Sequence, residues 1–144
     1  MLERPEMAKW NRLLENVPED FPKDQPVFML NLLQFYDQAQ YAEGSKHGPC
    51  SGQEAWVEGY LTEVRKLPGA GDDFELLYSG FPASKIVGED NERWDAVALV
   101  KFRDIAAFRK TLGSDEYAAT AAEHRDAALK DWKLIASTQV FDQI

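Results

Sequence analysis

The sequence predicts an α+β fold in which a four-stranded antiparallel sheet carries helices on one face. Two segments, Val27–Phe35 and Trp94–Phe102, are apolar on both sides of an extended chain, as is typical of strands covered on both faces. Each precedes a segment with helical periodicity and then a further apolar strand, Phe74–Gly80 or Trp132–Phe141. Strand, helix and strand, repeated once, make the ferredoxin-like βαββαβ pattern.

An N-terminal extension precedes this core. Apolar residues recur at helical spacing near the start of the chain: Met7, Trp10, Leu14 and Val17. They predict a short helix over Glu6–Asn16, which a proline-punctuated connector follows. We therefore expect a single domain, residues 1–144, in which the helix and linker of residues 1–25 lie on a core formed by residues 26–144.

The first strand and the connection after it differ in character. Asn31 is the single polar residue in the apolar run of the strand, on the face that it shares with Met29 and Leu33. The connection Gln34–Gly52 has about 19 residues, more than the roughly 12–15 beyond which unstructured loops become uncommon in a compact domain. We interpret it as a surface excursion, with a lid over a pocket as the alternative.

Capping residues mark where the helices begin. Three residues occupy N-cap positions: Ser51, Asp104 and Ser114. Ser51 is followed by Glu54, which completes a capping box. The first of these helices is expected to run to about Leu67, the second to Leu112 and the third to about Lys130.

The predicted topology leaves one face of the sheet without a cover. Right-handed crossovers place both long helices on the same face. The other face is also apolar, and the N-terminal helix is too short to cover it alone. We therefore expect a homodimer in which two subunits pack sheet against sheet.

Composition limits the possible partners and the setting. The 25 acidic and 16 basic side chains give a net charge of −9, which disfavours nucleic acid. A single cysteine, Cys50, excludes an internal disulfide. The N-terminus lacks the apolar core of a signal peptide, and no run is long enough to span a bilayer, so we expect a cytoplasmic protein that contacts no membrane.

Motifs for bound cofactors and metals are not found. The Gly69-Ala70-Gly71 run precedes a strand and not a helix, so it does not match a dinucleotide-binding loop. The chain has two histidines, His47 and His124, far apart in sequence and without an H-x-H or C-x-x-C motif. We therefore expect neither a cofactor nor a metal site.

Several segments resemble a known family: PVFMLNLLQF, SGQEAW, LLYSG, ERWDAVALVKF, SDEYAA and HRDAALKDWKLIA. They are similar to an uncharacterised, domain-of-unknown-function family of the dimeric α/β-barrel superfamily, which also holds the antibiotic-biosynthesis monooxygenases and muconolactone isomerases. The resemblance covers about Pro26–Ser137. It implies a homodimeric barrel with a ligand in the cleft between each sheet and its helices. Positions typical of the family are Asn31, Trp94, Asp95, His124 and Arg125. Trp132 departs from the family pattern, which has a small residue there, and would narrow a nearby cavity.

The last helix contains the most unusual charged residue. Arg125 falls in the middle of an apolar stripe that includes Tyr117, while His124 falls at its edge. A buried guanidinium requires a partner, because an unpaired buried charge is very costly. The favoured partner is an internal carboxylate or a helix-end carbonyl, and the alternative is an anionic or carbonyl-bearing ligand.

Three functions remain open at this stage. The first is a dimer that binds a small organic molecule, with Arg125, Tyr78, Trp94 and Tyr117 as ligand-binding residues. The second is a cofactor-independent monooxygenase or isomerase in which His124 and Asn31 are catalytic. The third is a structural dimer without a ligand site. A cavity that reaches Asn31 and Arg125 would favour the first two, and catalysis would further require His124 to point into it.

Overall fold

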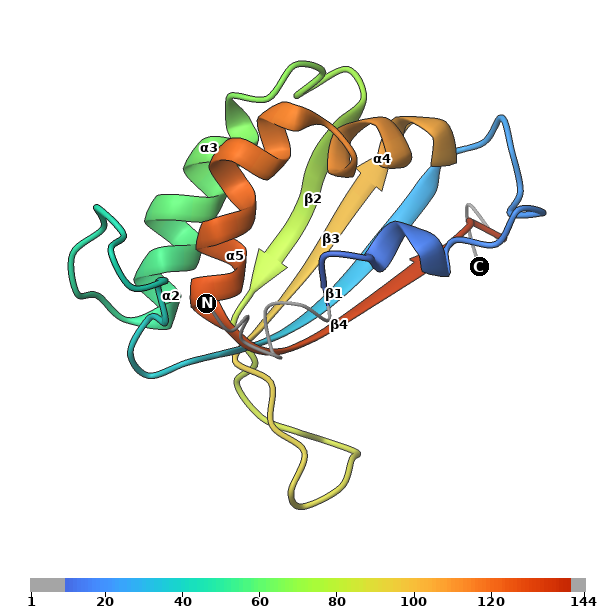
Figure 1. Ribbon diagram of the computed structural model, residues 1–144. Helices are drawn as coiled ribbons and strands as arrows, with labels where there is room; N and C mark the ends of the chain where they lie inside the picture. The colour runs from blue at the N-terminus through green and yellow to red at the C-terminus, as the bar shows by residue number, and fades with distance from the viewer. Residues whose placement is uncertain (1–9, 141–144) are drawn as a thin grey trace.

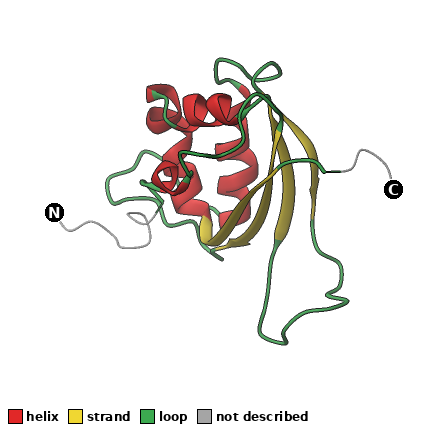
Figure 2. Ribbon diagram, turned by 90° about the vertical axis from the view of Figure 1, so that its right-hand side faces the viewer, coloured by secondary structure: helices red, strands yellow, loops and turns green. Residues whose placement is uncertain are grey.

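The computed structural model describes residues 10–140, and it confirms the α+β fold. Its four strands are β1 (Val27–Phe35), β2 (Phe74–Gly80), β3 (Ala96–Phe102) and β4 (Leu129–Ser137). They form one antiparallel sheet in the order β2-β3-β1-β4, which is compatible with a ferredoxin-like fold. The helices lie on one face of this sheet (Figures 1 and 2).

Two long helical segments and one short helix make up the covering layer. The first runs continuously through α2 (Gly52–Glu54), η2 (Ala55–Tyr60) and α3 (Leu61–Arg65). The last runs through η3 (Tyr117–Ala121) and α5 (Ala122–Ala128), and α4 (Ile105–Leu112) precedes it. Both η2 and η3 have the wider i→i+5 hydrogen bonding of a π-helix, which the sequence patterns do not predict.

The three predicted N-caps are confirmed. Ser51 Oγ accepts a hydrogen bond from the backbone of Glu54 at 3.0 Å, and the Glu54 side chain accepts one from the backbone of Ser51 at 2.9 Å. Asp104 accepts from the Ala107 amide at 2.8 Å. Ser114 Oγ accepts from the Tyr117 amide at 3.0 Å. Because each cap satisfies amide groups that the first helical turn leaves unpaired, it fixes the point where the helix begins.

The first strand is confirmed, and its side chains alternate as predicted. Its buried residues all face the helices: Val27, Met29, Asn31, Leu33 and Phe35. Asn31 pairs in register with Ala98 of β3 and Leu134 of β4. This register places the one polar side chain of the buried face near the middle of the sheet.

Predicted boundaries of the last helix and of the third and fourth strands are wrong; the fourth strand spans Leu129–Ser137, so it begins before Trp132. The last helix ends at Ala128 and not near Lys130, because Leu129 is already extended and pairs with Phe35 as the first residue of β4. The third strand begins at Ala96 and not at Trp94. The Asp95 carboxylate accepts the Phe35 amide hydrogen at 2.8 Å, in the place where a strand residue would offer a carbonyl.

The N-terminal segment lies on the helix side of the sheet, at the β4 edge (Figure 1). The part of the predicted helix that the structure describes, residues 10–16, is a turn followed by a short 3₁₀ helix, η1 (Leu13–Asn16), and residues 6–9 lie outside the described residues. Trp10 meets Trp132 of β4 edge to face, with ring centroids 5.8 Å apart. Leu13, Leu14 and Val17 pack against the core.

The connection between β1 and α2 is anchored to the end of α5. The Tyr36 amide donates to the Ala128 carbonyl at 2.9 Å, and the Gln40 amide donates to the Ala127 carbonyl at 2.8 Å. Carbonyl groups at a helix C-terminus lack partners within the helix, so these bonds terminate α5 while they hold the loop in place. The loop is therefore packed on the outer side of the helix layer.

The face of the sheet opposite the helices is uncovered within the described residues (Figure 2). Apolar side chains on and beside it are substantially exposed: Leu30 at 38%, Leu77 at 45%, Ile135 at 52% and Tyr78 at 59%. The connection between β2 and β3 extends away from the domain and carries the exposed Ile86 and Val87 (Figure 1). None of the described helices is long and apolar enough to cross a membrane.

Candidate binding cavity and the buried network behind it

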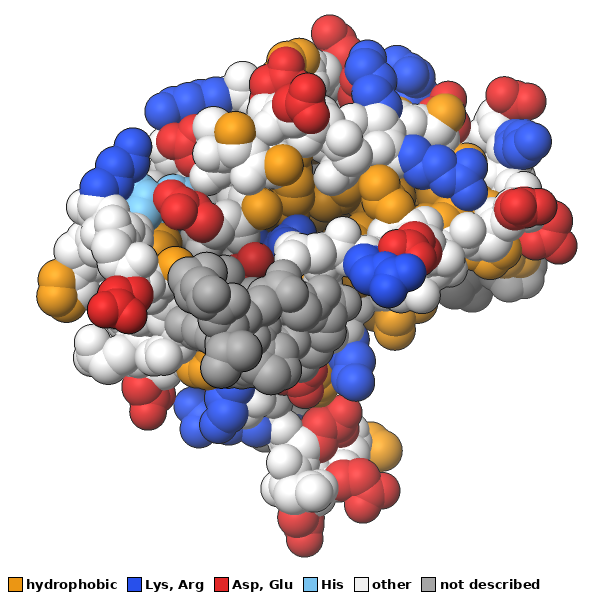
Figure 3. Space-filling model, viewed as in Figure 1, with side chains coloured by type: hydrophobic (Ala, Val, Ile, Leu, Met, Phe, Trp, Pro, Cys, Tyr) orange, Lys and Arg blue, Asp and Glu red, His pale blue; other side chains and the backbone are white. Residues whose placement is uncertain are grey.

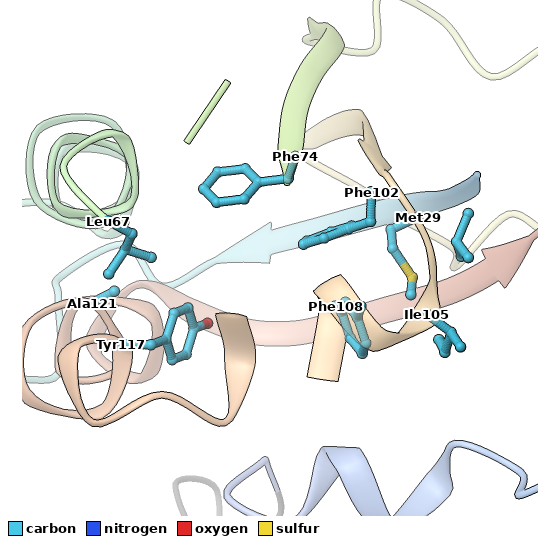
Figure 4. Close-up of a cluster of buried hydrophobic side chains, with 9 residues drawn as sticks. Met29, Leu67, Phe74, Phe102, Ile105, Phe108, Tyr117 and Ala121 are labelled. Atoms are coloured by element: carbon cyan, nitrogen blue, oxygen red, sulfur yellow. The ribbon is translucent and has the colours of Figure 1, made fainter. Parts of the chain in front are cut away.

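A cavity of about 320 Å³ lies between the sheet and the helices. Its volume is at the lower end of the range for small-molecule sites, roughly 300–1,000 Å³. Apolar side chains from both layers line most of it: Met29, Trp56, Leu61, Val64, Leu67, Phe74, Leu76, Ala98, Val100, Phe102, Phe108, Leu112 and Leu134. Several of them surround the open middle of the cluster drawn in Figure 4.

A second hollow of about 290 Å³ continues beneath the N-terminal segment. It shares Met29, Phe108, Trp132 and Leu134 with the first cavity. Apolar side chains are visible in the hollow between α4 and the segment around η1 (Figure 3). The two hollows are therefore adjacent and have these four side chains in common.

Two tyrosine hydroxyl groups are the central polar feature of the wall. Tyr60 closes the π-helical segment η2 and Tyr117 opens η3, and both residues line the cavity. Their hydroxyl oxygens are 2.8 Å apart and hydrogen bonded, and Tyr117 Oη also accepts from the Arg125 guanidinium at 3.3 Å. Figure 4 shows the Tyr117 hydroxyl turned toward Phe102 and Phe108.

The number of hydroxyl hydrogens determines how many hydrogen bonds the Tyr60–Tyr117 pair can donate to a ligand. Arg125 can only donate, so its bond to Tyr117 uses none of the tyrosine hydrogens. One of the two hydroxyl hydrogens makes the bond between Tyr60 and Tyr117. The other has no acceptor within the part of the chain that the structure describes. The pair therefore offers one hydrogen-bond donor to a molecule in the cavity.

Both hydroxyl groups stay protonated at neutral pH. Burial raises the pKa of Tyr60 well above its ordinary value, and the neighbouring Tyr117 raises it further. Burial also raises the pKa of Tyr117, although the Arg125 charge opposes that rise. The two tyrosines therefore present neutral hydroxyl groups to the cavity, and neither is a phenolate.

Arg125 lies behind this wall. It is only 3% exposed, its Nε donates to Asp126 Oδ1 at 3.0 Å, and it is not among the residues that line the cavity. Burial lowers its pKa, but the interactions with Tyr117 and Asp126 outweigh that effect and raise the pKa above the ordinary value. The guanidinium also lies over the Trp132 ring, 5.8 Å from its centroid. This geometry matches the favoured expectation of an internal carboxylate partner.

Asn31 and Trp132 form a second polar element of the wall. Trp132 Nε1 donates to Asn31 Oδ1 at 3.0 Å, and Asn31 Nδ2 donates to the Met29 carbonyl at 3.2 Å. Both side chains line the cavity. The large Trp132 ring fills the space beside Asn31 and covers Arg125, which limits the cavity on that side.

Thr111 adds a further polar group. The residue lines the cavity from α4 and is 6% exposed. Its Oγ1 is buried without a hydrogen-bond partner among the described residues. Buried hydroxyl groups are nearly always paired in proteins, so this oxygen is a candidate contact for a bound molecule or water.

Besides Arg125, two more of the four predicted ligand-binding residues, Tyr78 and Trp94, do not line the cavity. Tyr78 would share the face of Phe74 by simple alternation, but a bulge between Leu76 and Tyr78 reverses the pattern. Tyr78 consequently pairs with Leu99 and lies on the uncovered side of the sheet at 59% exposure. Trp94 precedes β3, and its Nε1 donates to the Glu92 carboxylate at 3.2 Å.

The predicted catalytic pair is separated. Asn31 lines the cavity, but His124 is not among the lining residues. Its Nδ1 is hydrogen bonded to the Tyr41 hydroxyl at 2.6 Å, and its ring is packed beside that of His47. The geometry therefore does not place the imidazole where it could act with Asn31 on one bound molecule.

The fold brings together two histidines that are 77 positions apart in sequence. The His47 and His124 ring centroids are 4.5 Å apart, and His47 Nε2 contacts Glu123 Oε1 at 2.6 Å. One ligating atom from each of His47, Glu123 and His124 lies within 4.8 Å of the others. We expected no metal site because the two histidines are far apart in the sequence. The fold brings their rings together, so that reason does not hold. No local motif signals this group, because the loop that carries His47 has no periodicity.

Comparison with solved structures supports the fold. The chain is similar to the RPA0582 protein of Rhodopseudomonas palustris, a protein of unknown function, with 22% identity and a TM-score of 0.73 over 97% of this chain and 96% of that one. A structure of the methylated RPA0582 protein gives 22% identity and a TM-score of 0.68 over 98% and 95% of the two chains. No family model and no curated protein matches the chain.

Proposed function

We propose that the protein binds a small, neutral and largely apolar molecule that carries a carbonyl or similar hydrogen-bond acceptor. The observation that carries this proposal is the surplus hydroxyl hydrogen of the Tyr60–Tyr117 pair in the wall of an apolar cavity. An acceptor on the ligand would satisfy that hydrogen, and the apolar body would fill the remaining space. The Thr111 hydroxyl supports a second polar contact.

A neutral ligand fits the electrostatics better than an anion. The Arg125 charge is balanced by Asp126 and separated from the cavity by the tyrosine pair and Trp132. The whole chain carries a net charge of −9, which disfavours the approach of an anion. In this proposal Arg125 positions Tyr117 and does not contact the ligand.

We further propose that the protein is a homodimer of the dimeric α/β-barrel superfamily, formed through the uncovered face of the sheet. The exposed apolar residues of that face support this assembly. The monooxygenase or isomerase alternative is not favoured, since His124 contacts Tyr41 and His47 and does not line the cavity.

The binding proposal can be tested with prodan, a neutral ketone on a naphthalene ring whose emission reports burial and hydrogen bonding. We expect saturable binding with blue-shifted emission. The Tyr60→Phe/Tyr117→Phe double variant should bind prodan about three- to tenfold more weakly, because one net hydrogen bond is worth about 0.5–1.5 kcal/mol. Dimethylaminonaphthalene, which lacks the ketone, should bind both proteins equally.

A cavity-filling variant provides the independent control. Ala98 lines the cavity from β3, whereas the next residue, Val97, lies on the opposite face. Ala98→Leu should abolish prodan binding, and Val97→Leu should leave it unchanged. Circular dichroism spectra of the variants serve as the control that each variant is folded. Prodan affinity that survives Ala98→Leu would show that the dye binds elsewhere and would refute the cavity as the site.

A further inference from the structure

A cluster of three metal-ligating side chains lies on the outer side of the helix layer. His47 comes from the connection between β1 and α2, whereas Glu123 and His124 are neighbours in α5. One ligating atom from each residue lies within 4.8 Å of the other two. The proposed binding cavity uses none of these residues.

The ligand types of the cluster suit a metal ion. Each imidazole offers a nitrogen lone pair in its neutral form, and the Glu123 carboxylate supplies a negative charge. The two imidazole rings are already close together, with centroids 4.5 Å apart.

The surrounding residues hold His124 in a fixed orientation. The Tyr41 hydroxyl is hydrogen bonded to His124 Nδ1 at 2.6 Å. Because Tyr41 occupies Nδ1, Nε2 is the nitrogen left for an ion, as in many sites where a second residue orients a histidine ligand. Gly59 makes room for the ring, since a Cβ at that position would lie 2.5 Å from His124 Nδ1.

We propose that His47, Glu123 and His124 form a binding site for a divalent transition-metal ion of the zinc type, with water completing its coordination. Two imidazoles and one carboxylate are ligands that zinc and its neighbours prefer over calcium or magnesium. An ion with bonds of about 2.0–2.1 Å requires ligand atoms roughly 3.4 Å apart. The His47 and Glu123 side chains are 25% and 49% exposed, so they can rotate toward the buried His124. The ion would join the loop that carries His47 to α5.

The experiment uses the full-length, untagged protein after treatment with a chelator. Calorimetric titration with Zn²⁺ should show one ion bound per chain, and Co²⁺ should give the intense visible absorption of a four-coordinate site. His47→Gln removes a ligand in a partly exposed loop, so folding should survive the change. It should weaken Zn²⁺ binding at least about 100-fold, because losing even an outer partner of a ligand costs about 10–100-fold.

Two further variants distinguish Zn²⁺ binding at this site from nonspecific Zn²⁺ binding to acidic side chains on the surface. Tyr41→Phe removes the orienting hydroxyl and should weaken Zn²⁺ binding about tenfold without changing the stoichiometry. Glu116→Gln removes an exposed carboxylate from the same helical segment and should have no effect. Failure of the wild-type protein to bind Zn²⁺, or equal affinity in wild type and His47→Gln, would overturn the proposal. Neither result depends on occupancy of the apolar cavity.

Discussion

Replacing Arg125 by methionine tests whether this residue belongs to a structural ion pair. Methionine keeps the length and apolar stem of the side chain but removes the charge. Asp126, 5% exposed, would lose the guanidinium that now lies 3.0 Å from its carboxylate, and Tyr117 would lose a hydrogen-bond donor. Removing one partner of a buried pair typically destabilises a protein by about 3–5 kcal/mol. We expect a loss of free energy of unfolding in that range.

The measurement is urea unfolding at one fixed protein concentration, because the stability of an oligomer depends on concentration. The double variant Arg125→Met/Asp126→Asn should lose less free energy of unfolding than the sum of the two single variants, because the two side chains interact directly. Arg93→Met is the matched control. Its side chain is 72% exposed and pairs with Asp95, so its effect should be below about 1 kcal/mol. A loss below 1 kcal/mol for Arg125→Met would refute the structural role and return Arg125 to the candidates for ligand contact.

Three other predictions follow from local geometry. Gly52→Ala should destabilise the protein by at least about 2 kcal/mol in urea unfolding, because a Cβ at that position would lie far too close to the backbone oxygens of Tyr36 and Ala128. Gly48→Ala is the control and should be neutral, because a Cβ there meets nothing within 4 Å. An equal change in the free energy of unfolding for the two substitutions would contradict the close packing of the chain around Gly52. Leu30→Glu on the uncovered sheet face should convert a dimer to a monomer in light scattering, and Ala119→Glu on the exposed side of a helix should not. A wild-type monomer would refute the assembly. Three tyrosines have raised pKa values: Tyr41, Tyr60 and Tyr117. In the folded protein these pKa values exceed the ordinary value of about 10, so the unfolded chain loses its hydroxyl protons first as the pH rises. The free energy of unfolding should therefore be constant with respect to these groups below pH 10 and should fall above it. Phenolate absorbance of these residues should appear at higher pH in the native protein than in urea, and coincident titrations would contradict their burial.

The helix boundaries show what can be predicted from sequence. Ser51, Asp104 and Ser114 are caps whose effect is local, so the pattern alone located the start of each helix. The end of the last helix depends on a long-range contact, the pairing of Leu129 with Phe35, and the prediction was therefore wrong by two residues. The wider turns at η2 and η3 likewise have no local pattern that identifies them.

The candidate site was only partly accessible from the sequence. An arginine on an apolar stripe indicated a buried pair, but its partner Asp126 is the adjacent residue and helical spacing does not point to it. Tyr78 was assigned to the pocket because a bulge cannot be read from the alternation of apolar residues. Tyr60 was not among the residues predicted to line the site. The need of its buried hydroxyl for a partner is the signal that could have linked it to Tyr117.

The wider helical turns at η2 and η3 give each tyrosine-bearing helix a place where the chain can change length by one residue. Each turn contains one residue more than an α-helix would need, and Tyr60 and Tyr117 lie at their ends. If one residue of such a turn were deleted, the same backbone groups could bond in the ordinary i→i+4 pattern, and the side chains beyond the turn would keep their orientation. A deletion in an ordinary α-helical turn would instead rotate the following side chains by about 100° around the helix axis. Among related proteins, the hydroxyl pair should therefore tolerate a one-residue difference in length at these turns and not elsewhere in the same helices.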